Sequence, residues 1–264
     1  MTDNLHAAAH ELLRGAREVL VLTGAGISSA SGVPTFRGEN GLWNDFKVED
    51  LATPEAFERD PCLVWRWYDE RRESTARCVP NAAHHALARF AASRDGVTIV
   101  TQNVDGLHDA AARALPAELP AHARMRALPL SLHGTLFGVR CSRCEYREKT
   151  SERVDATSVN TLPRCSCGAL LRPDVVWFGE MLPERELARA LGATENPQVC
   201  LSVGTSALVH PAAALAEQAV RNGAALVEVD PQETMLSSIA TIAIRQDAAV
   251  ALPIILGSDS PAEA

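Results

Sequence analysis

The stretch that decides the fold is VLVLTGAGISSASG, which runs from Val19 to Gly32. It opens with a short run of apolar, β-branched residues, typical of a strand that is buried on both faces. A glycine turn and a segment with a helical pattern follow. This order favours binding of a pyrophosphate, because the backbone can approach it closely and the helix N-terminus faces its negative charge.

The glycine turn by itself leaves another interpretation open. Gly24 and Gly26 match the first two glycines of the usual dinucleotide fingerprint, but Ser29 stands where the third is common. A strand-to-helix turn that binds no ligand explains the same residues. The residues at the other strand ends are therefore needed to distinguish a ligand-binding turn from one that binds nothing.

Further short apolar runs follow along the chain, and alanine-rich helical stretches separate several of them. One such helix, predicted over residues 211–223, opens with proline and closes with glycine, as helices tend to. Strands that alternate with helices predict an α/β fold, a Rossmann-like, doubly wound parallel sheet. The other predicted strands are VTIV (97–100), LPLSL (128–132), VCLSV (199–203), ALVEV (225–229) and VALPIIL (250–256).

Two stretches interrupt the alternation of strands and helices. Residues 38–97 are helical and rich in aromatic side chains, and residues 135–173 contain four cysteines and many turn formers. We expect these insertions to form one small helical and zinc-binding module. The final residues, GSDSPAEA, are predicted to be a disordered tail. The Rossmann-like domain would then comprise residues 1–37, 98–134 and 174–264.

The composition argues against several classes of protein. The 264 residues are 47% hydrophobic, enough for a sizeable core, and the net charge of -8 lacks the basic footprint of a nucleic-acid binder. No apolar run reaches the roughly 18 residues of a membrane-spanning helix, and the N-terminus has no signal-peptide layout. We therefore expect a cytoplasmic monomer without nucleic-acid or membrane partners, whose cysteines are thiols or metal ligands.

Polar side chains follow two more of the predicted strands. Gln102, Asn103 and Asp105 come after the second strand, and His133 follows the third. Ligands of doubly wound sheets bind outside the carboxyl ends of the strands, and histidine is the usual general base. Each segment also has a plain structural explanation, as a helix cap or as a hydrogen-bonded core histidine. Their convergence with the glycine turn favours a cofactor site.

The four cysteines have the spacing of metal ligands. Cys141 and Cys144 form a C-x-x-C knuckle, and Cys165 and Cys167 form a C-x-C pair. Four thiolates on two tight turns can complete a tetrahedral structural zinc site. No histidine or carboxylate at this spacing leaves a coordination position open, so we assign no catalysis to the metal. The alternative is a set of free surface thiols.

The order of these motifs along the chain resembles that of the sirtuins, and the resemblance covers nearly the whole chain. It implies a protein lysine deacylase that uses NAD as co-substrate and contains one structural zinc. The motifs that carry it are the four cysteines together with GAGIS (24–28), GVPTFR (32–37), TQNVDGLH (101–108), LHGT (132–135), RPDVVWFGE (172–180) and GTS (204–206).

The resemblance also implies roles for individual residues. His133 would act as the general base on the nicotinamide ribose, with Asn103 beside it, so that acyl transfer yields free lysine, nicotinamide and O-acyl-ADP-ribose. Asp230 stands where the family commonly has Asn at the adenine ribose, and Ala248 would contact adenine. The residues assigned to NAD are Gly24, Ala25, Gly26, Ser28, Thr35, Arg37, Trp43, Gln102, Asn103, Asp105, Gly204, Thr205, Ser206, Asp230 and Ala248.

By the same resemblance, Val175, Trp177 and Phe178 line the channel for the acylated lysine. The protein substrate would bind beside Val175 as an added β-strand, in which main-chain hydrogen bonds give the affinity.

A predicted helix bears on the choice of acyl group. It begins near Asp60 and Pro61, which suit the cap and the first helical position. An arginine on the apolar face of this helix needs an anionic partner, and its planar fork matches a carboxylate. The residues that share this face are Val64, Trp67, Tyr68 and Arg71.

The pair Tyr68 and Arg71 resembles that of the desuccinylase and demalonylase branch, class III, as do Ala52 and Thr35. We therefore expect a preference for succinyl and malonyl groups, with residual deacetylation. Alternatively, Arg71 pairs with a protein carboxylate or extends to water. The competing functions are a primary lysine deacetylase, a mono-ADP-ribosyltransferase, and a zinc-ribbon nucleic-acid module, which the acidic charge disfavours.

Overall fold

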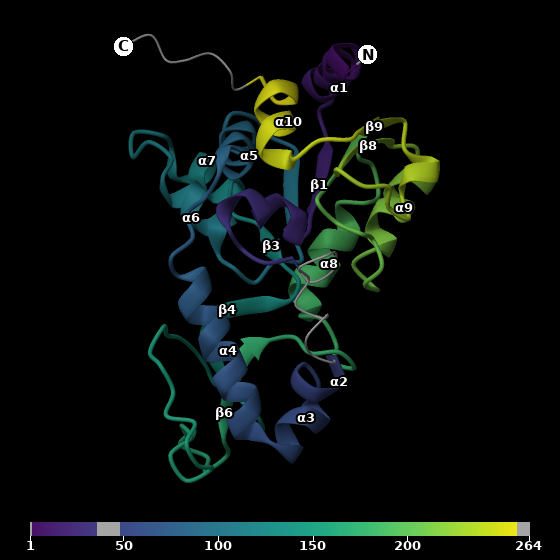
Figure 1. The fold of residues 1–264 in the computed structure, drawn as a ribbon. Coiled ribbons are helices and arrows are strands. Elements are labelled where there is room, and N and C mark those ends of the chain that lie inside the picture. The colour runs from purple at the N-terminus through teal and green to yellow at the C-terminus, as the bar shows by residue number, and fades with distance from the viewer. Residues whose placement is uncertain (1, 36–47, 258–264) are drawn as a thin grey trace.

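The computed structural model describes residues 2–35 and 48–257. Its main sheet has six parallel strands in the order β3-β2-β1-β7-β8-β9 (Figure 1). This is a doubly wound sheet whose order reverses between β1 and β7, so a ligand is expected outside the carboxyl ends of these strands. The strands are β1 (Val19–Thr23), β2 (Val97–Thr101), β3 (Leu130–Ser131), β7 (Val199–Val203), β8 (Ala225–Val229) and β9 (Ile242–Ile244).

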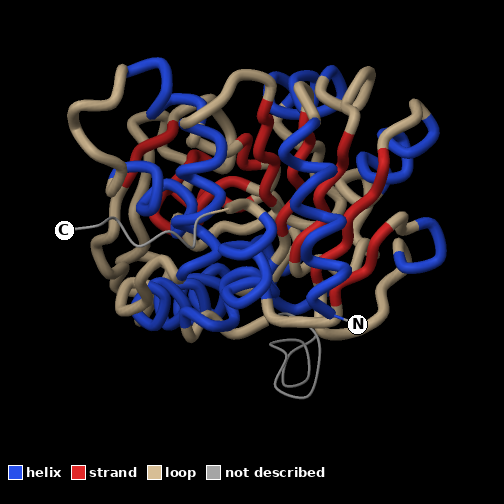
Figure 2. The backbone as a smooth tube through the Cα atoms, turned by 90° about the horizontal axis from the view of Figure 1, so that it is seen from above, coloured by secondary structure: helices blue, strands red, loops and turns tan. Residues whose placement is uncertain are grey.

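Helices cover both faces of this sheet (Figure 2). Successive side chains of a strand point to opposite faces, and in β1 Val19 and Val21 join one buried cluster while Leu20 and Leu22 join another. The predicted α/β class is therefore confirmed. The first cluster contains α1 (Thr2–Gly15), α5 (Ala82–Ala92), α6 (Leu107–Arg113) and α10 (Ala248–Ile255), and the second α8 (Glu184–Gly192) and α9 (Ala214–Arg221). A further short helix, α7, spans Ala121–Arg126.

The predicted strand over residues 250–256 is wrong, because this segment belongs to helix α10. Its face with Ala251, Leu252 and Ile255 is buried, whereas Val250 is exposed. A short, continuously apolar run cannot distinguish a buried strand from a buried helix by its pattern. The last strand is instead the short β9, and the strand predicted over residues 128–132 is reduced to the two residues of β3.

A second, smaller sheet has the order β5-β4-β6 and shares a core with three helices, at the bottom of Figure 1. Helix α4 begins as predicted, since the Asp60 side chain accepts a hydrogen bond from the Leu63 N–H at 2.9 Å. The elements of this small module are α2 (Val48–Leu51), α3 (Pro54–Arg59), α4 (Pro61–Thr75), β4 (Gly134–Cys141), β5 (Arg147–Lys149) and β6 (Leu171–Val175).

One part of the predicted division into domains differs from the structure. Helix α5 lies within residues 38–97, which the sequence assigned to the small module, yet it packs in the core of the main sheet beside α6 and α10. An alanine-rich helix does not reveal which sheet its buried face will cover. The remaining boundaries stay a prediction, and the predicted tail lies outside the described residues except for Gly257. No helix within the described ranges is long and apolar enough to cross a membrane.

Candidate active site

A cavity of about 770 Å³ lies at the carboxyl ends of the main-sheet strands and is also lined by the small module. Gly24 to Gly26 follow β1, Gln102 and Asn103 follow β2, and His133 lies between β3 and β4. The three strand ends that the sequence analysis singled out therefore meet at one place. Predicted residues that line the cavity are Gly24, Ala25, Gly26, Thr35, Ala52, Tyr68, Arg71, Gln102, Asn103, His133, Val175, Trp177, Phe178, Gly204, Thr205, Ser206 and Asp230.

The glycine turn packs directly on the end of β7. A Cβ atom added at Gly26 would lie 2.6 Å from the Gly204 Cα, and one added at Gly24 would lie 2.7 Å from the Gly204 oxygen. The Gly26 N–H also donates to the Gly204 oxygen at 2.8 Å. These glycines are thus required by the contact between two strand ends as well as by any ligand. The helix that the sequence predicted after the turn is the 3₁₀ helix Ala25–Ser31.

Ser28 and Asp105 are buried and are not among the residues that line this cavity, so their predicted contact with the cofactor stays a prediction. The Ser28 hydroxyl donates to Asp105 Oδ2 at 2.7 Å. The Asn103 amide donates to the Gly24 oxygen at 3.1 Å and to Ser28 Oγ at 3.2 Å. Burial raises the pKa of Asp105, partly offset by hydrogen bonds from Leu107 and Ser28. The Ser28 hydroxyl, oriented by Asp105, thus holds the Asn103 amide, which in turn bonds the glycine turn at Gly24.

The ring of His133 is oriented by the backbone. Its Nδ1 lies 3.0 Å from the Gln102 carbonyl oxygen. A carbonyl can only accept, so Nδ1 carries the proton and Nε2 keeps a lone pair. Burial lowers the pKa of His133, partly offset by this hydrogen bond, and the ring is neutral at pH 7. A neutral imidazole at the edge of a cavity is suited to take a proton.

Helix α4 contributes a phenol and a guanidinium group to the cavity wall, from Tyr68 and Arg71. The Trp177 indole N–H donates to Tyr68 Oη at 2.9 Å, and the Arg71 guanidinium lies 4.6 Å from the centre of the Trp67 ring. Asp69 does not pair with Arg71, since it forms a buried ion pair with Arg72 at 3.2 Å. Of the predicted face of α4, Tyr68 and Arg71 line the cavity, whereas Val64 and Trp67 are buried and do not.

The loop after β8 forms another part of the cavity wall, and Asp230 lies on it. Burial raises the pKa of Asp230. Ala248 is buried at the start of α10 and does not line the cavity, so its predicted contact with adenine gains no support.

Sequence reasoning missed the residues that hold this loop. Glu228 is buried at 1% exposure, accepts from the hydroxyl groups of Thr234 and Ser237, and pairs with Arg245 at 2.7 Å. The signal was an acid inside the apolar run ALVEV, because a buried carboxylate needs partners.

Comparison with known proteins decides the family. The sequence profile described as the Sir2 family matches residues 24–211, which span the glycine turn, His133 and the cysteines. The chain belongs to the Sir2 family.

Relatives and solved structures agree over nearly the full length of this Sir2 chain. A protein of Pyrococcus abyssi named NAD-dependent protein deacylase is 42% identical over 249 residues, which are 93% of this chain and 94% of that protein. The structure of a Sir2 homologue in complex with NAD has a TM-score of 0.82 at 38% identity and covers 96% and 93% of the two chains. A Sir2 protein bound to a propionylated peptide has a TM-score of 0.74 at 29% identity, with coverage of 94% and 95%.

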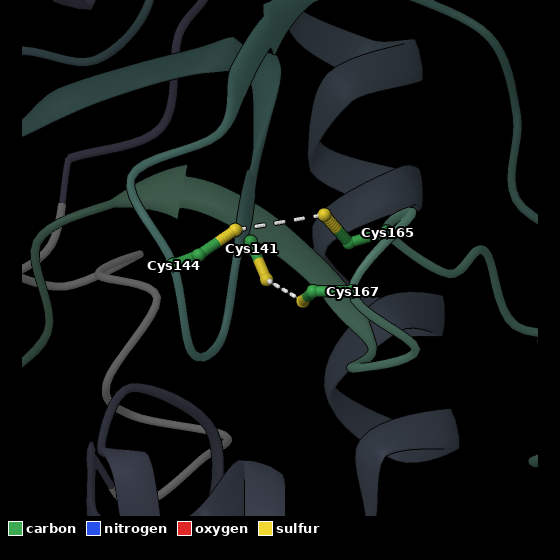
Figure 3. Close-up of side chains that lie close together, drawn as sticks. All are labelled: Cys141, Cys144, Cys165 and Cys167. Atoms are coloured by element: carbon green, nitrogen blue, oxygen red, sulfur yellow. Dashed lines mark hydrogen bonds between the residues drawn. The ribbon is translucent and has the colours of Figure 1, made fainter.

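The four cysteines of this Sir2 chain lie close together and form a second site (Figure 3). None of them lines the cavity. Their sulfur atoms all lie within 4.8 Å of one another, with Cys141 to Cys167 at 3.5 Å and Cys144 to Cys165 at 3.6 Å. A tetrahedral zinc with bonds of about 2.3 Å places its sulfur ligands roughly 3.8 Å apart, so the cluster fits this ion. The predicted zinc site is confirmed as a four-cysteine cluster, and a site whose cysteines do not line the cavity suits a structural role.

Arg37 and Trp43, which the resemblance places over the cofactor, lie outside the described residues.

Proposed function

We propose that this Sir2 chain removes acyl groups from lysine side chains of proteins with NAD as co-substrate, and that it favours succinyl and malonyl over acetyl groups. The observation that carries the proposal is that Arg71 and Tyr68 line the same cavity as His133 and the glycine turn. The relatives named NAD-dependent protein deacylase and the neighbouring NAD complex support the reaction class.

The residues at the strand ends suit a dinucleotide. Gly24 to Gly26 bring backbone to the cavity at the switch point of the sheet, where doubly wound folds bind nucleotides. Gly204 to Ser206 and Asp230 line the part of the cavity beyond β7 and β8, and would hold the adenosine half. The Gln102 amide donates to Thr205 Oγ1 at 3.0 Å. This bond links the segment after β2 to the segment after β7.

NAD supplies a ribose carbon from which nicotinamide can leave. The chain supplies a base, because the Nε2 lone pair of His133 is available at neutral pH to take a proton from a ribose hydroxyl group. Asn103 is held at the same edge by the Gly24 oxygen and by Ser28. Since none of the four cysteines lines the cavity, the zinc site stabilises the module and takes no part in this proton transfer.

The acyl preference rests on the positive charge of Arg71 at the cavity wall that α4 forms. A succinyl or malonyl group ends in a carboxylate, which accepts hydrogen bonds from a guanidinium fork and from a phenol. Arg71 is half-buried, and burial lowers its pKa, which Coulombic interactions with Tyr68 and Asp105 partly offset. A substrate carboxylate at this wall would add a further favourable interaction with the guanidinium group. Ala52 lines the cavity near this wall with a small side chain and leaves room for a longer acyl chain.

The protein substrate would bind as an extended strand at the mouth of the cavity. Val175 ends β6, and Phe178 lines the cavity while 43% exposed. The neighbouring complex with a propionylated peptide supports binding of an acylated peptide.

The proposal is tested with peptides that differ only in the acyl group on one lysine. Turnover of acetyl, malonyl and succinyl peptides with labelled NAD should release nicotinamide and O-acyl-ADP-ribose, fastest from the acidic substrates. Equal turnover of all three peptides would contradict the acyl preference. Label that stays on protein would instead support ADP-ribosyl transfer.

A further inference from the structure

The hydroxyl group of Tyr68 has a fixed direction of hydrogen bonding. Trp177 Nε1 lies 2.9 Å from Tyr68 Oη, and both side chains are buried. An indole nitrogen can only donate, so the phenol oxygen is the acceptor in this bond. Within residues 2–35 and 48–257, no other hydrogen bond reaches this oxygen. The proton of Tyr68 therefore remains to be donated to another group.

Trp177 is itself held at several points. Its backbone N–H donates to Glu180 Oε2 at 2.8 Å, and the Arg172 guanidinium lies 3.8 Å from its ring centre. Arg172 is 4% exposed and binds both Glu180 oxygens, at 2.7 and 2.8 Å. The ring of Phe57 packs at 5.4 Å. The indole cannot turn away from Tyr68 without breaking contacts to this ion pair.

We propose that Trp177 is a positioning residue for acidic acyl groups, because its indole N–H occupies the acceptor side of the Tyr68 hydroxyl and turns that hydroxyl into a donor toward the cavity. The inference rests on the proposed acyl preference and deepens it. A carboxylate can only accept, so it matches a phenol whose proton is available. Burial raises the pKa of Tyr68 to about 12, and the hydroxyl keeps its proton at neutral pH.

The same arrangement explains why the wall discriminates between substrates. The cationic group on this wall is Arg71, which lies one turn of helix from Tyr68. Arg172 pairs with Glu180 and does not line the cavity, whereas Arg71 does, so Arg71 presents the positive charge at this wall and Tyr68 the directed donor. An acetyl group ends in a methyl group and gains nothing from either.

The substitution Trp177→Phe tests this role, because it removes the N–H and keeps an aromatic ring beside Phe57 and Arg172. We expect the ratio of kcat/KM for a succinyl-lysine peptide to that for an acetyl-lysine peptide to fall roughly tenfold, mainly through the KM of the succinyl peptide. Binding of the succinyl peptide without turnover should weaken by a similar factor in calorimetry. Equal losses on both peptides would overturn the proposal.

Trp65→Phe is the matched control. It removes a buried indole N–H bond of 3.0 Å to the Leu171 oxygen in the same module, and Trp65 does not line the cavity. The control should lose stability without changing the ratio of succinyl to acetyl activity. If Trp177→Phe fails to fold, the benzothienyl analogue of tryptophan at position 177 keeps the ring shape and removes only the donor.

A double-mutant comparison separates this inference from the proposed function. If Trp177 acts through the Tyr68 hydroxyl, the combination Tyr68→Phe with Trp177→Phe should lose no more than Tyr68→Phe alone. Additive losses would show that Trp177 acts by another route and would overturn the inference. If Tyr68→Phe and Arg71→Met leave the succinyl-to-acetyl ratio unchanged, the acyl preference itself fails. If these two lower the ratio and Trp177→Phe does not, only the inference fails.

Discussion

His133 Nδ1 lies 3.0 Å from the carbonyl oxygen of Gln102, and this contact determines which nitrogen of the ring acts as the base. The bond links the third strand end to the second, so the orientation of the base depends on the register of the main sheet. His133→Ala should abolish acyl removal while leaving the thermal unfolding curve close to that of the unchanged protein. Normal turnover of any acylated peptide by this variant would refute the assignment.

The pH dependence of turnover follows from the same side chain. Burial lowers the pKa of His133 from its usual value near 6.5, so the neutral, basic form persists below that pH. We expect kcat/KM to be constant around neutrality and to fall on acidification, with a midpoint below 6.5. A midpoint above this usual value would contradict the effect of burial on the catalytic histidine.

Arg71→Met should lower activity on succinyl-lysine far more than on acetyl-lysine. A hydrogen bond to a charged group is worth about 1.5 to 3 kcal/mol, which corresponds to roughly a tenfold to hundredfold loss in kcat/KM. Arg66→Met serves as the control, because Arg66 lies on the same helix but is exposed and does not line the cavity. A loss of the same size on both substrates would count against the acyl pocket.

Removal of metal should unfold the small module, because a structural zinc contributes directly to folding. The measurement is a thermal unfolding curve before and after dialysis against a chelator, together with the metal content of the protein. Cys165→Ser should reproduce the effect, whereas Cys78→Ser should not, since Cys78 lies outside the cluster. An unchanged curve in metal-free protein would exclude the structural role.

Two buried histidines predict a loss of stability in acid. Burial lowers the pKa of His84 to about 3 and that of His108 to about 4. Their unfolded pKa is near 6.5, so the unfolded state binds more protons below that pH, and stability present above pH 6.5 is lost as pH falls toward 4. In this pH window, each histidine lowers the free energy of unfolding by about 1.4 kcal/mol for each pH unit of acidification.

Denaturant unfolding between about pH 7 and pH 4 measures this slope. His108→Gln should make it shallower by the share of one histidine, although it also removes the bond to Thr23 Oγ1 and lowers the starting stability. His122→Gln is the control at an exposed position. An unaltered slope in the His108 variant would show that this histidine does not titrate on unfolding.

Gly26→Ala should destabilise the protein even without ligand, because the new Cβ would meet the backbone of Gly204. Overpacking of this kind costs about 1–3 kcal/mol. Gly192→Ala provides the comparison, since nothing lies within 4 Å of a Cβ added there. Equal unfolding free energies for the two variants would mean that the glycine turn serves the ligand alone.

The local patterns of the sequence were enough for much of this protein. The strand and glycine turn from Val19, the polar residues after Thr101, the capped helix after Asp60 and the cysteine spacing all predicted elements that the structure confirms. These features depend on contacts between residues close in the chain, such as caps, turns and the alternation of side chains along a strand. For that reason they can be recognised without knowing what packs against them.

Tertiary structure decided what depends on partners distant in the chain. It turned the apolar run at residues 250–256 into a helix, placed α5 on the main sheet, and brought Asp105 into a hydrogen bond with Ser28. It also brought Trp177 to Tyr68, across 109 positions of sequence. Which face of an apolar segment is buried, and which side a hydroxyl group donates to, is decided by the neighbour that folding supplies, and no local pattern contains that neighbour.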